Sequence, residues 1–244
     1  MMRLLMALFL ICCGTLHARS AELPEFDLAN RLYAQGKFTE AASNYLQLIQ
    51  AGKLSPAIYF NLGNAYYKSG EAGRAIAAYR HAERLGPRDP DLRANLEFVR
   101  RQVQGPSHQP ARLDRAIERF TLNEWTVIAL APFWISVLTF ALIQFRPGLR
   151  GSLRGLAWTF AAIALVGFAG MGIAWKHASQ PVAVVIATES TVRNGPLEEA
   201  PQAFSARNGA ELQVIDEKDA WLQVSAGNRI GWLKRDDVIL WRGI

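Results

Sequence analysis

The chain has 244 residues, 50% of them hydrophobic, and a formal net charge of +6. This length allows one large domain or two smaller ones, so it excludes little by itself. The apolar residues are concentrated in a few segments, and their positions are therefore more informative than the overall composition.

Residues 1–20 have the pattern of a secretory signal peptide. A single arginine precedes the apolar run Leu4 to Leu16, which is too short to cross a bilayer comfortably, and small residues follow it. We expect cleavage after Ser20, which removes both cysteines, Cys12 and Cys13, and with them any thiol chemistry. The mature chain then has 25 basic and 21 acidic residues, a charge too small to predict a nucleic-acid partner.

Residues 22–103 contain a repeat whose period matches the length of a tetratricopeptide unit, about 34 residues. The second copy, PAIYFNLGNAYYKSGEAGRAIAAYRHAERLGP, resembles the tetratricopeptide consensus. The resemblance implies an all-α solenoid with repeats at 22–55 and 56–89 and a capping helix at 90–103. A shift by one period superimposes Phe26 on Phe60, Ala29 on Gly63, Asn30 on Asn64, Tyr33 on Tyr67, Gly36 on Gly70, Ala41 on Ala75 and Tyr45 on Tyr79.

In tetratricopeptide proteins the first helices of successive repeats line a groove that binds peptides. The basic residues that complete a carboxylate clamp in some members are missing, because Phe26 and Ala94 stand at those positions. We therefore expect a general peptide groove. Its asparagines have two possible roles, contact with a peptide or bracing of the helices. By the resemblance, the groove is lined by Phe26, Asn30, Tyr33, Phe60, Asn64 and Tyr67.

Residues 124–145 and 155–175 are predicted to form two transmembrane helices. Each contains a run of 21 residues without an ionisable side chain, which is long enough to cross the hydrocarbon core of a bilayer. A linker that includes an amphipathic helical pattern, residues 104–123, precedes the first span.

The loop between these spans, residues 146–154, carries Arg146, Arg150 and Arg154 and no acid. Short loops rich in arginine favour the cytoplasmic side, where they contact membrane lipid, but three further arginines stand just before the first span. The export signal decides between the two orientations. It predicts a cytoplasmic loop and a multi-pass protein of the bacterial inner membrane, with its N- and C-terminal domains in the periplasm.

Residues 180–244 change to short alternating runs that predict a small all-β barrel: PVAVVIA, ELQVI, WLQV, IGWL and VILW. The segments VRNGP, NGAELQVI, AWLQV and GWL resemble the bacterial SH3 domain in order and spacing. We expect the two tryptophans of this pattern to fill the core, because small barrels need large side chains. The signature consists of Val192, Arg193, Gly195, Pro196, Trp221, Gly231 and Trp232.

The sequence carries no pattern that indicates catalysis or metal binding. None of the four histidines has a partner at ligand spacing, and the chain has no GxSxG, HExxH or phosphate-binding loop. We therefore predict a protein that is not an enzyme and needs no cofactor.

The order of the parts resembles the BatE family of the bacterial aerotolerance operon: a signal peptide, tetratricopeptide repeats, two spans and an SH3-like barrel. The resemblance implies a role in aerotolerance or stress. It also implies partners among von Willebrand A-domain membrane proteins and a MoxR-type ATPase system. We expect a multidomain membrane scaffold for protein interactions. The alternative is a cell-wall sensor or adaptor whose SH3-like domain binds peptidoglycan.

Overall fold

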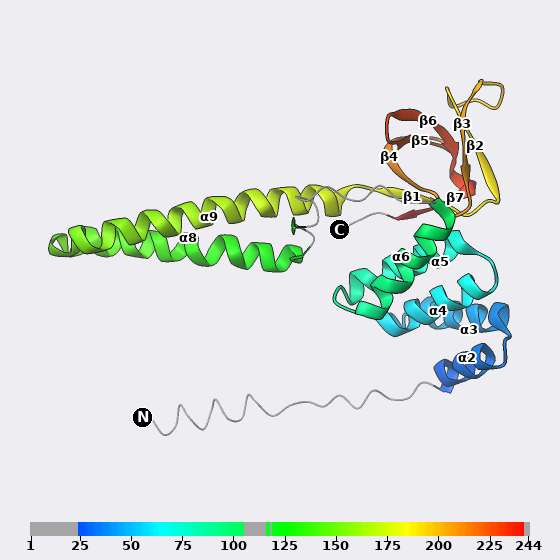
Figure 1. Cartoon of the computed structure of the whole chain (residues 1–244), viewed down its shortest axis with the longest axis horizontal. Coiled ribbons are helices and arrows are strands. Elements are labelled where there is room, and N and C mark those ends of the chain that lie inside the picture. The colour runs from blue at the N-terminus through cyan, green and yellow to red at the C-terminus, as the bar shows by residue number, and fades with distance from the viewer. Residues whose placement is uncertain (1–23, 105–115, 118, 242–244) are drawn as a thin grey trace.

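The computed structural model describes residues 24–104, 116–117 and 119–241. The predicted signal peptide, with both cysteines, lies outside the described residues, as does most of the predicted linker. The described chain forms a helical solenoid, a hairpin of two long helices and a β domain (Figure 1).

The helical solenoid consists of α2 (Pro24–Ala34), α3 (Phe38–Gln50), α4 (Pro56–Lys68), α5 (Ala72–Leu85) and α6 (Pro90–Gln104). Local signals fix the start of α4, since the Ser55 hydroxyl accepts a hydrogen bond from the Ile58 amide at 3.2 Å and Pro56 occupies the first turn. Each helix packs against the next one in the chain. The repeat period of the sequence therefore corresponds to a repeating helix pair.

Small residues at repeating positions let these helices approach each other closely. Ala41 and Ala75, which are equivalent in the two repeats, are both fully buried. A Cβ atom at Gly63 would lie only 2.5 Å from the ring of Tyr79, so α4 and α5 can meet here only with glycine.

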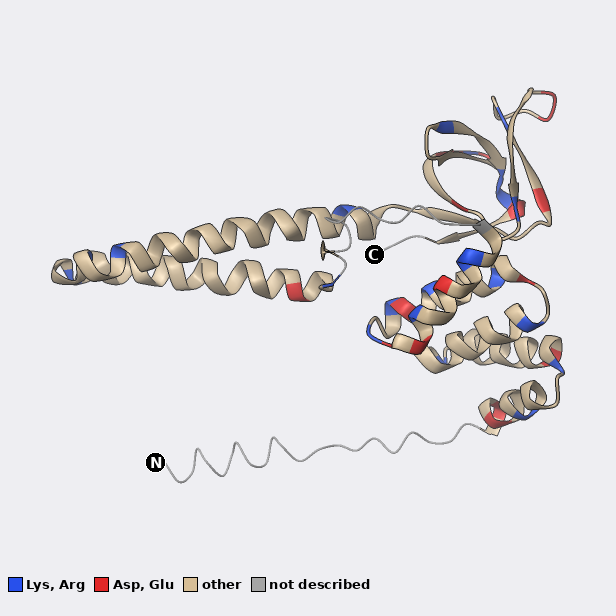
Figure 2. Cartoon of the chain, viewed as in Figure 1, with Lys and Arg blue, Asp and Glu red and all other residues tan. Residues whose placement is uncertain are grey.

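The hairpin consists of α8 (Leu122–Phe145), the short 3₁₀ helix η1 (Pro147–Leu149) and α9 (Arg150–Ser179). Both long helices are long and apolar enough to cross a membrane by length and composition. Charged residues gather at the two ends of the hairpin, and its middle has none (Figure 2). The three arginines of the predicted loop lie exposed at the tip; Arg150 begins α9 and Arg154 lies in its second turn.

A backbone contact near the middle of the hairpin holds α8 against α9. Pro132 has no amide hydrogen, so it cannot donate to the carbonyl of Ile128 one turn earlier. That carbonyl faces Gly167 of α9, where a Cβ atom would lie 2.9 Å from the Ile128 oxygen. A side chain at Gly167 would therefore separate the helices, whereas glycine permits a close Cα–H contact with the carbonyl.

The β domain is one antiparallel seven-stranded sheet in the order β3-β2-β6-β5-β4-β1-β7, with a 3₁₀ turn η2 (Arg235–Asp237) before its last strand. Strands β2 and β3 lie in the stretch between the first two predicted β-type runs; the other five strands correspond to those runs. The strands are β1 (Val182–Val185), β2 (Glu189–Arg193), β3 (Gln202–Arg207), β4 (Glu211–Lys218), β5 (Trp221–Ala226), β6 (Arg229–Lys234) and β7 (Val238–Trp241).

The helical solenoid and the β domain pack against each other through α5 and α6 on one side and β1, β7 and the turn before β4 on the other (Figure 1). We call this contact the seam. It comprises Gly73, Ile76, Arg80, Arg100 and Val103 of the solenoid, and Val184, Val185, Asn208, Gly209, Glu211 and Trp241 of the β domain.

We predict that Gly170→Leu loosens the hairpin, because a Cβ atom at Gly170 would overlap the Trp125 ring of α8. Overpacking of this kind costs about 1–3 kcal/mol, so the melting temperature in detergent micelles should fall by several degrees. Gly172→Leu, on the same helix, is the matched control because nothing lies within 4 Å of its Cβ position. Equal melting temperatures for the two variants would contradict the packing described.

Candidate interaction surfaces

The six residues predicted to line a groove lie on two neighbouring first helices. Phe26, Asn30 and Tyr33 are on α2, and Phe60, Asn64 and Tyr67 are on α4. All six are partly buried, so each retains some accessible surface. Their placement on equivalent faces of α2 and α4 leaves a peptide-binding role open.

Two of these residues are the centres of a hydrogen-bond pattern that recurs once per repeat. The Asn30 side-chain oxygen accepts from the Tyr45 hydroxyl at 2.6 Å and from the Asn61 amide nitrogen at 3.0 Å. In the next repeat the Asn64 oxygen accepts from Tyr79 at 2.6 Å and from Asn95 at 3.1 Å. Each asparagine thus joins three helices, α2, α3 and α4 in one case and α4, α5 and α6 in the other.

These bonds use both lone pairs of each asparagine oxygen, which leaves only the amide nitrogens to meet a ligand. Burial raises the pKa of Tyr45 to about 12 and raises that of Tyr79 as well, so both hydroxyls stay protonated and donate at physiological pH. The geometry therefore favours the bracing role for Asn30 and Asn64.

Aromatic rings continue from these helices onto α6. The Tyr67 ring meets Phe98 edge-on with centroids 5.7 Å apart, and the Tyr67 hydroxyl donates to Gln102 Oε1 at 2.9 Å. Phe98 is 46% exposed. Sequence reasoning missed both α6 residues. Phe98 stands one repeat period after the groove residue Asn64, so the period was enough to find it, whereas Gln102 is equivalent to Lys68, which was not predicted to line the groove.

In the β domain, two residues of the predicted signature bring β2 and β6 together. Val192 is fully buried, and a Cβ atom at Gly231 would lie 2.6 Å from its side chain. Arg193 Nη1 donates to the Ala200 carbonyl at 2.8 Å, which ties down the loop that contains Gly195 and Pro196. These residues therefore have a structural role in shaping the loop between β2 and β3.

The prediction that Trp221 and Trp232 fill the core was wrong. The buried cluster of the β domain contains their neighbours Leu222 and Leu233, and both tryptophans are partly exposed. Side chains alternate across a strand, so a buried Leu222 turns Trp221 outward. The size of tryptophan suggested a core position, but the period of the strand decides the face.

The tryptophans share the outer face of β5 and β6 with charged groups. The Lys234 ammonium lies 5.9 Å from the centre of the Trp221 ring and 2.7 Å from Glu198 Oε1 in the loop between β2 and β3. Lys234 thereby lowers the pKa of Glu198. The register of β5 and β6 places Trp221 opposite Lys234 and Gln223 opposite Trp232. We call these four residues, Trp221, Gln223, Trp232 and Lys234, the tryptophan face.

Comparison with known families supports both parts of this architecture. Residues 26–90 match the family described as Tetratricopeptide repeat, and residues 188–239 match the family described as Bacterial SH3 domain. The chain contains tetratricopeptide repeats and a bacterial SH3 domain. The β domain is hereafter called the SH3 domain.

Part of the chain is similar to two curated tetratricopeptide proteins. Tetratricopeptide repeat protein 17 of Rattus norvegicus is 30% identical over 79 residues, and the protein of the same name from Mus musculus is 29% identical over 79 residues. These matches cover 32% of this chain and only 7% of each relative. The chain therefore spans only a small part of the length of these relatives.

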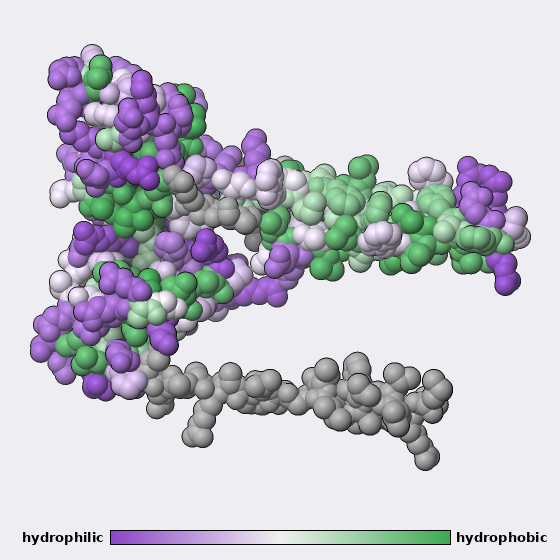
Figure 3. Space-filling model, turned by 180° about the vertical axis from the view of Figure 1, so that it is seen from behind, coloured by the Kyte–Doolittle hydropathy of each residue, from purple (hydrophilic) through white to green (hydrophobic). Residues whose placement is uncertain are grey.

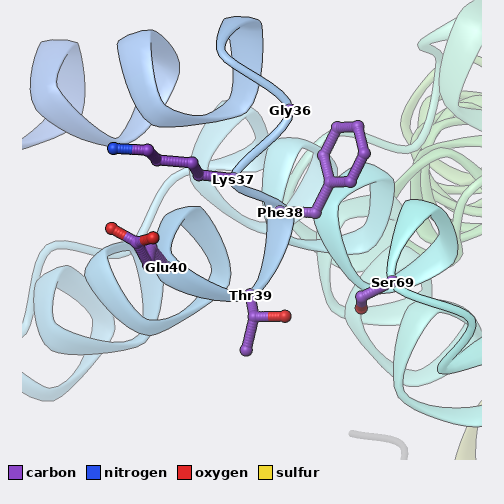
Figure 4. A pocket seen from close by; sticks show the side chains of 6 residues that line it. All are labelled: Gly36, Lys37, Phe38, Thr39, Glu40 and Ser69. Carbon is purple, nitrogen blue, oxygen red and sulfur yellow. The ribbon is translucent and has the colours of Figure 1, made fainter.

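A small cavity of about 270 Å³ lies near the start of α3 (Figure 4). It lies between the turn that joins α2 to α3 and the C-terminal end of α4. The Phe38 ring on its wall also meets Tyr33 edge-on at 5.2 Å, so the cavity extends the surface formed by the predicted groove residues. Its lining consists of Gly36, Lys37, Phe38, Thr39, Glu40 and Ser69.

We predict that Tyr79→Phe destabilises the solenoid by about 1 kcal/mol, because it removes one of the two hydrogen bonds to the Asn64 oxygen. The measurement is the melting temperature of the full chain in detergent, followed by circular dichroism in the far ultraviolet. Tyr67→Phe is the control, since the bond from its hydroxyl to Gln102 is exposed to water and its loss should cost much less. An equal shift for both variants would argue against the bracing role.

Proposed function

We propose that the protein is a non-enzymatic scaffold anchored in the bacterial inner membrane, with its tetratricopeptide solenoid and SH3 domain in the periplasm. Both matched families are binding modules, which supports an interaction role. The observation that carries the proposal is the aromatic surface on α2, α4 and α6. Tyr33, Tyr67 and Phe98 all keep accessible surface there, and the Tyr67 ring meets Phe98 edge-on.

The ligand that suits this surface is an extended peptide with apolar side chains and an acidic group. Tyr67 and Phe98 offer ring faces and edges to apolar side chains. Lys68 and Arg101, which flank the Tyr67–Gln102 contact in sequence, are both exposed and can attract a carboxylate. A peptide bound here would contact three helices of the solenoid.

The hairpin supports the proposed anchorage. Its surface is covered by apolar residues along most of its length (Figure 3), and its arginine tip lies at the far end from both the solenoid and the SH3 domain (Figures 1 and 2). Such an arrangement suits two spans whose connection is cytoplasmic and whose outer ends carry two domains on the same side.

We further propose that the scaffold belongs to a membrane complex of the aerotolerance type. Its partners would be von Willebrand A-domain membrane proteins and a MoxR-type ATPase system, as the resemblance to the BatE family implies.

A second candidate function, a cell-wall sensor, is favoured by the tryptophan face. Partly exposed indole rings beside Gln223 and Lys234 offer stacking surfaces and hydrogen-bond donors of the kind that sugar and peptide groups of peptidoglycan need.

A photo-crosslinking amino acid at Phe98 should capture a discrete protein partner in native membranes, because this ring is accessible beside Tyr67. The matched control is Leu85, which is 41% exposed at the end of α5. Adducts at Leu85 as abundant as those at Phe98, or none at Phe98, would refute the peptide surface.

A crosslinker at Trp232 separates the two functions, since protein adducts favour the scaffold and peptidoglycan fragments favour the sensor.

The orientation is tested with a reporter enzyme that is active only in the periplasm. Fused after Gly151, at the arginine tip, the reporter should be inactive, whereas fused at the C-terminus it should be active. The opposite pair of results would reverse the proposed topology, and activity at both sites would refute the membrane-spanning hairpin.

A further inference from the structure

The helical solenoid ends in an incomplete repeat. The first two repeats each supply two helices, α2 with α3 and α4 with α5, whereas among the residues that the structure describes the third supplies α6 alone. A solenoid without a terminal cover exposes the apolar surface on which its next helix would pack. Here Ile76 of α5 and Val99 of α6 are nevertheless 0% and 1% exposed, so another element covers them.

Strand β1 of the SH3 domain supplies part of that cover. Its residues face two different cores, since Ala183 and Val185 belong to the buried cluster of the SH3 domain and Val184, fully buried, belongs to that of the solenoid. This division follows from the alternation of side chains along a strand. An apolar residue at every position of β1 is the pattern of a strand that is buried on both faces.

The turn before β4 completes the cover. A Cβ atom at Gly209 would lie 2.8 Å from Val103 of α6 and 3.3 Å from Ile76 of α5, so this backbone rests directly on both helices. Gly209 also has φ +83°, a conformation that favours glycine. Glycine is therefore required here both by the turn and by the contact.

Polar bonds fix the position of the two domains along the seam. The amide of Gly73, in the first turn of α5, donates to Asn208 Oδ1 at 2.7 Å. A Cβ atom at Gly73 would overlap the carbonyl oxygen of Val185. Asn208 in turn donates to the Ile186 carbonyl at 2.6 Å, so one side chain links α5 to the segment that follows β1.

An ion cluster closes the seam. The Glu211 carboxylate, whose side chain is 10% exposed, accepts from Arg80 Nε at 2.6 Å and from Arg100 Nε at 2.5 Å. Burial alone would raise the pKa of Glu211, but the two guanidinium groups outweigh it and hold the pKa below its ordinary value. The Arg80 guanidinium also lies 5.3 Å from the centre of the Trp241 ring of β7.

We infer that the SH3 domain is the C-terminal cap of the solenoid, docked where the second helix of a third repeat would lie. Only Gln180 and Pro181 separate α9 from β1. The solenoid is therefore attached to the hairpin through the chain that follows α6 and through the seam, in addition to the exposed Arg88–Glu124 ion pair. The SH3 domain acts as a structural joint between the repeats and the membrane helix, not as an independently tethered module.

The test separates the two attachments. A protease site is introduced between residues 105 and 115 of the full chain, the protein is reconstituted in lipid vesicles, and the linker is cut. The vesicles are then washed with high salt, which screens the exposed Arg88–Glu124 pair far more than the buried seam. If the SH3 domain caps the solenoid, the cut solenoid stays on the vesicles.

Glu211→Lys should release the cut solenoid at least about tenfold faster, because it leaves two partly buried arginines facing a third cation. Glu198→Lys is the matched control, since it breaks an ion pair of the SH3 domain outside the seam and should leave retention unchanged. Gly73→Val provides a second test by steric overlap without a change of charge. Circular dichroism of each uncut variant shows whether the helices remain folded.

Rapid release of the solenoid from the unsubstituted protein after cutting would overturn the inference. So would equal release rates for Glu211→Lys, Gly73→Val and Glu198→Lys. Retention in the unsubstituted protein and in Glu198→Lys, with release in the two seam variants, is the expected result.

Discussion

The arrangement of the protein depends on the burial of strand β1 on both of its faces. One face completes the core of the SH3 domain and the other, through Val184, completes the core of the solenoid. Because α9 leads into this strand after two residues, the long helix is joined almost directly to both domains. Neither domain can change its position relative to the other without exposing apolar surface of this strand.

The ion cluster at Glu211 adds specificity to this contact more than stability. Moving a carboxylate and two guanidinium groups out of water is costly, and attraction in a buried pair often does no more than offset that cost. Loss of a single partner is different, because the remaining charge stays buried without compensation. The cluster therefore fixes one docking position and penalises others, while the apolar contacts of Val184 and Gly209 supply the attraction.

The repeat explains why so much of the fold could be predicted. Its period identified the helix pairs, and two uncharged runs identified the hairpin. Strands β2 and β3 were missed because ESTVR and QAFSAR contain few large apolar residues. The same period should have revealed Phe98, which is equivalent to Asn64, since equivalent positions in a solenoid lie on equivalent faces.

The candidate surfaces were harder to predict, because they depend on contacts between distant segments. The sequence left Asn30 and Asn64 with two possible roles, and only their bonds to Tyr45 and Tyr79 favour bracing. Nothing in the pattern pairs Glu211 with arginines so far earlier in the chain. One signal for the seam was present, since PVAVVI is apolar without alternation and such a run indicates a strand covered on both sides.

The docking of the SH3 domain on the solenoid is tested most directly by measuring the distance between the two domains in the intact protein. Spin labels at the exposed residues Ser43 of α3 and Ser205 of β3, in a chain whose two native cysteines are replaced by serine, would report it by double electron–electron resonance. A docked SH3 domain predicts one narrow distance distribution that broadens in Glu211→Lys. A broad distribution in the unsubstituted protein would contradict the account.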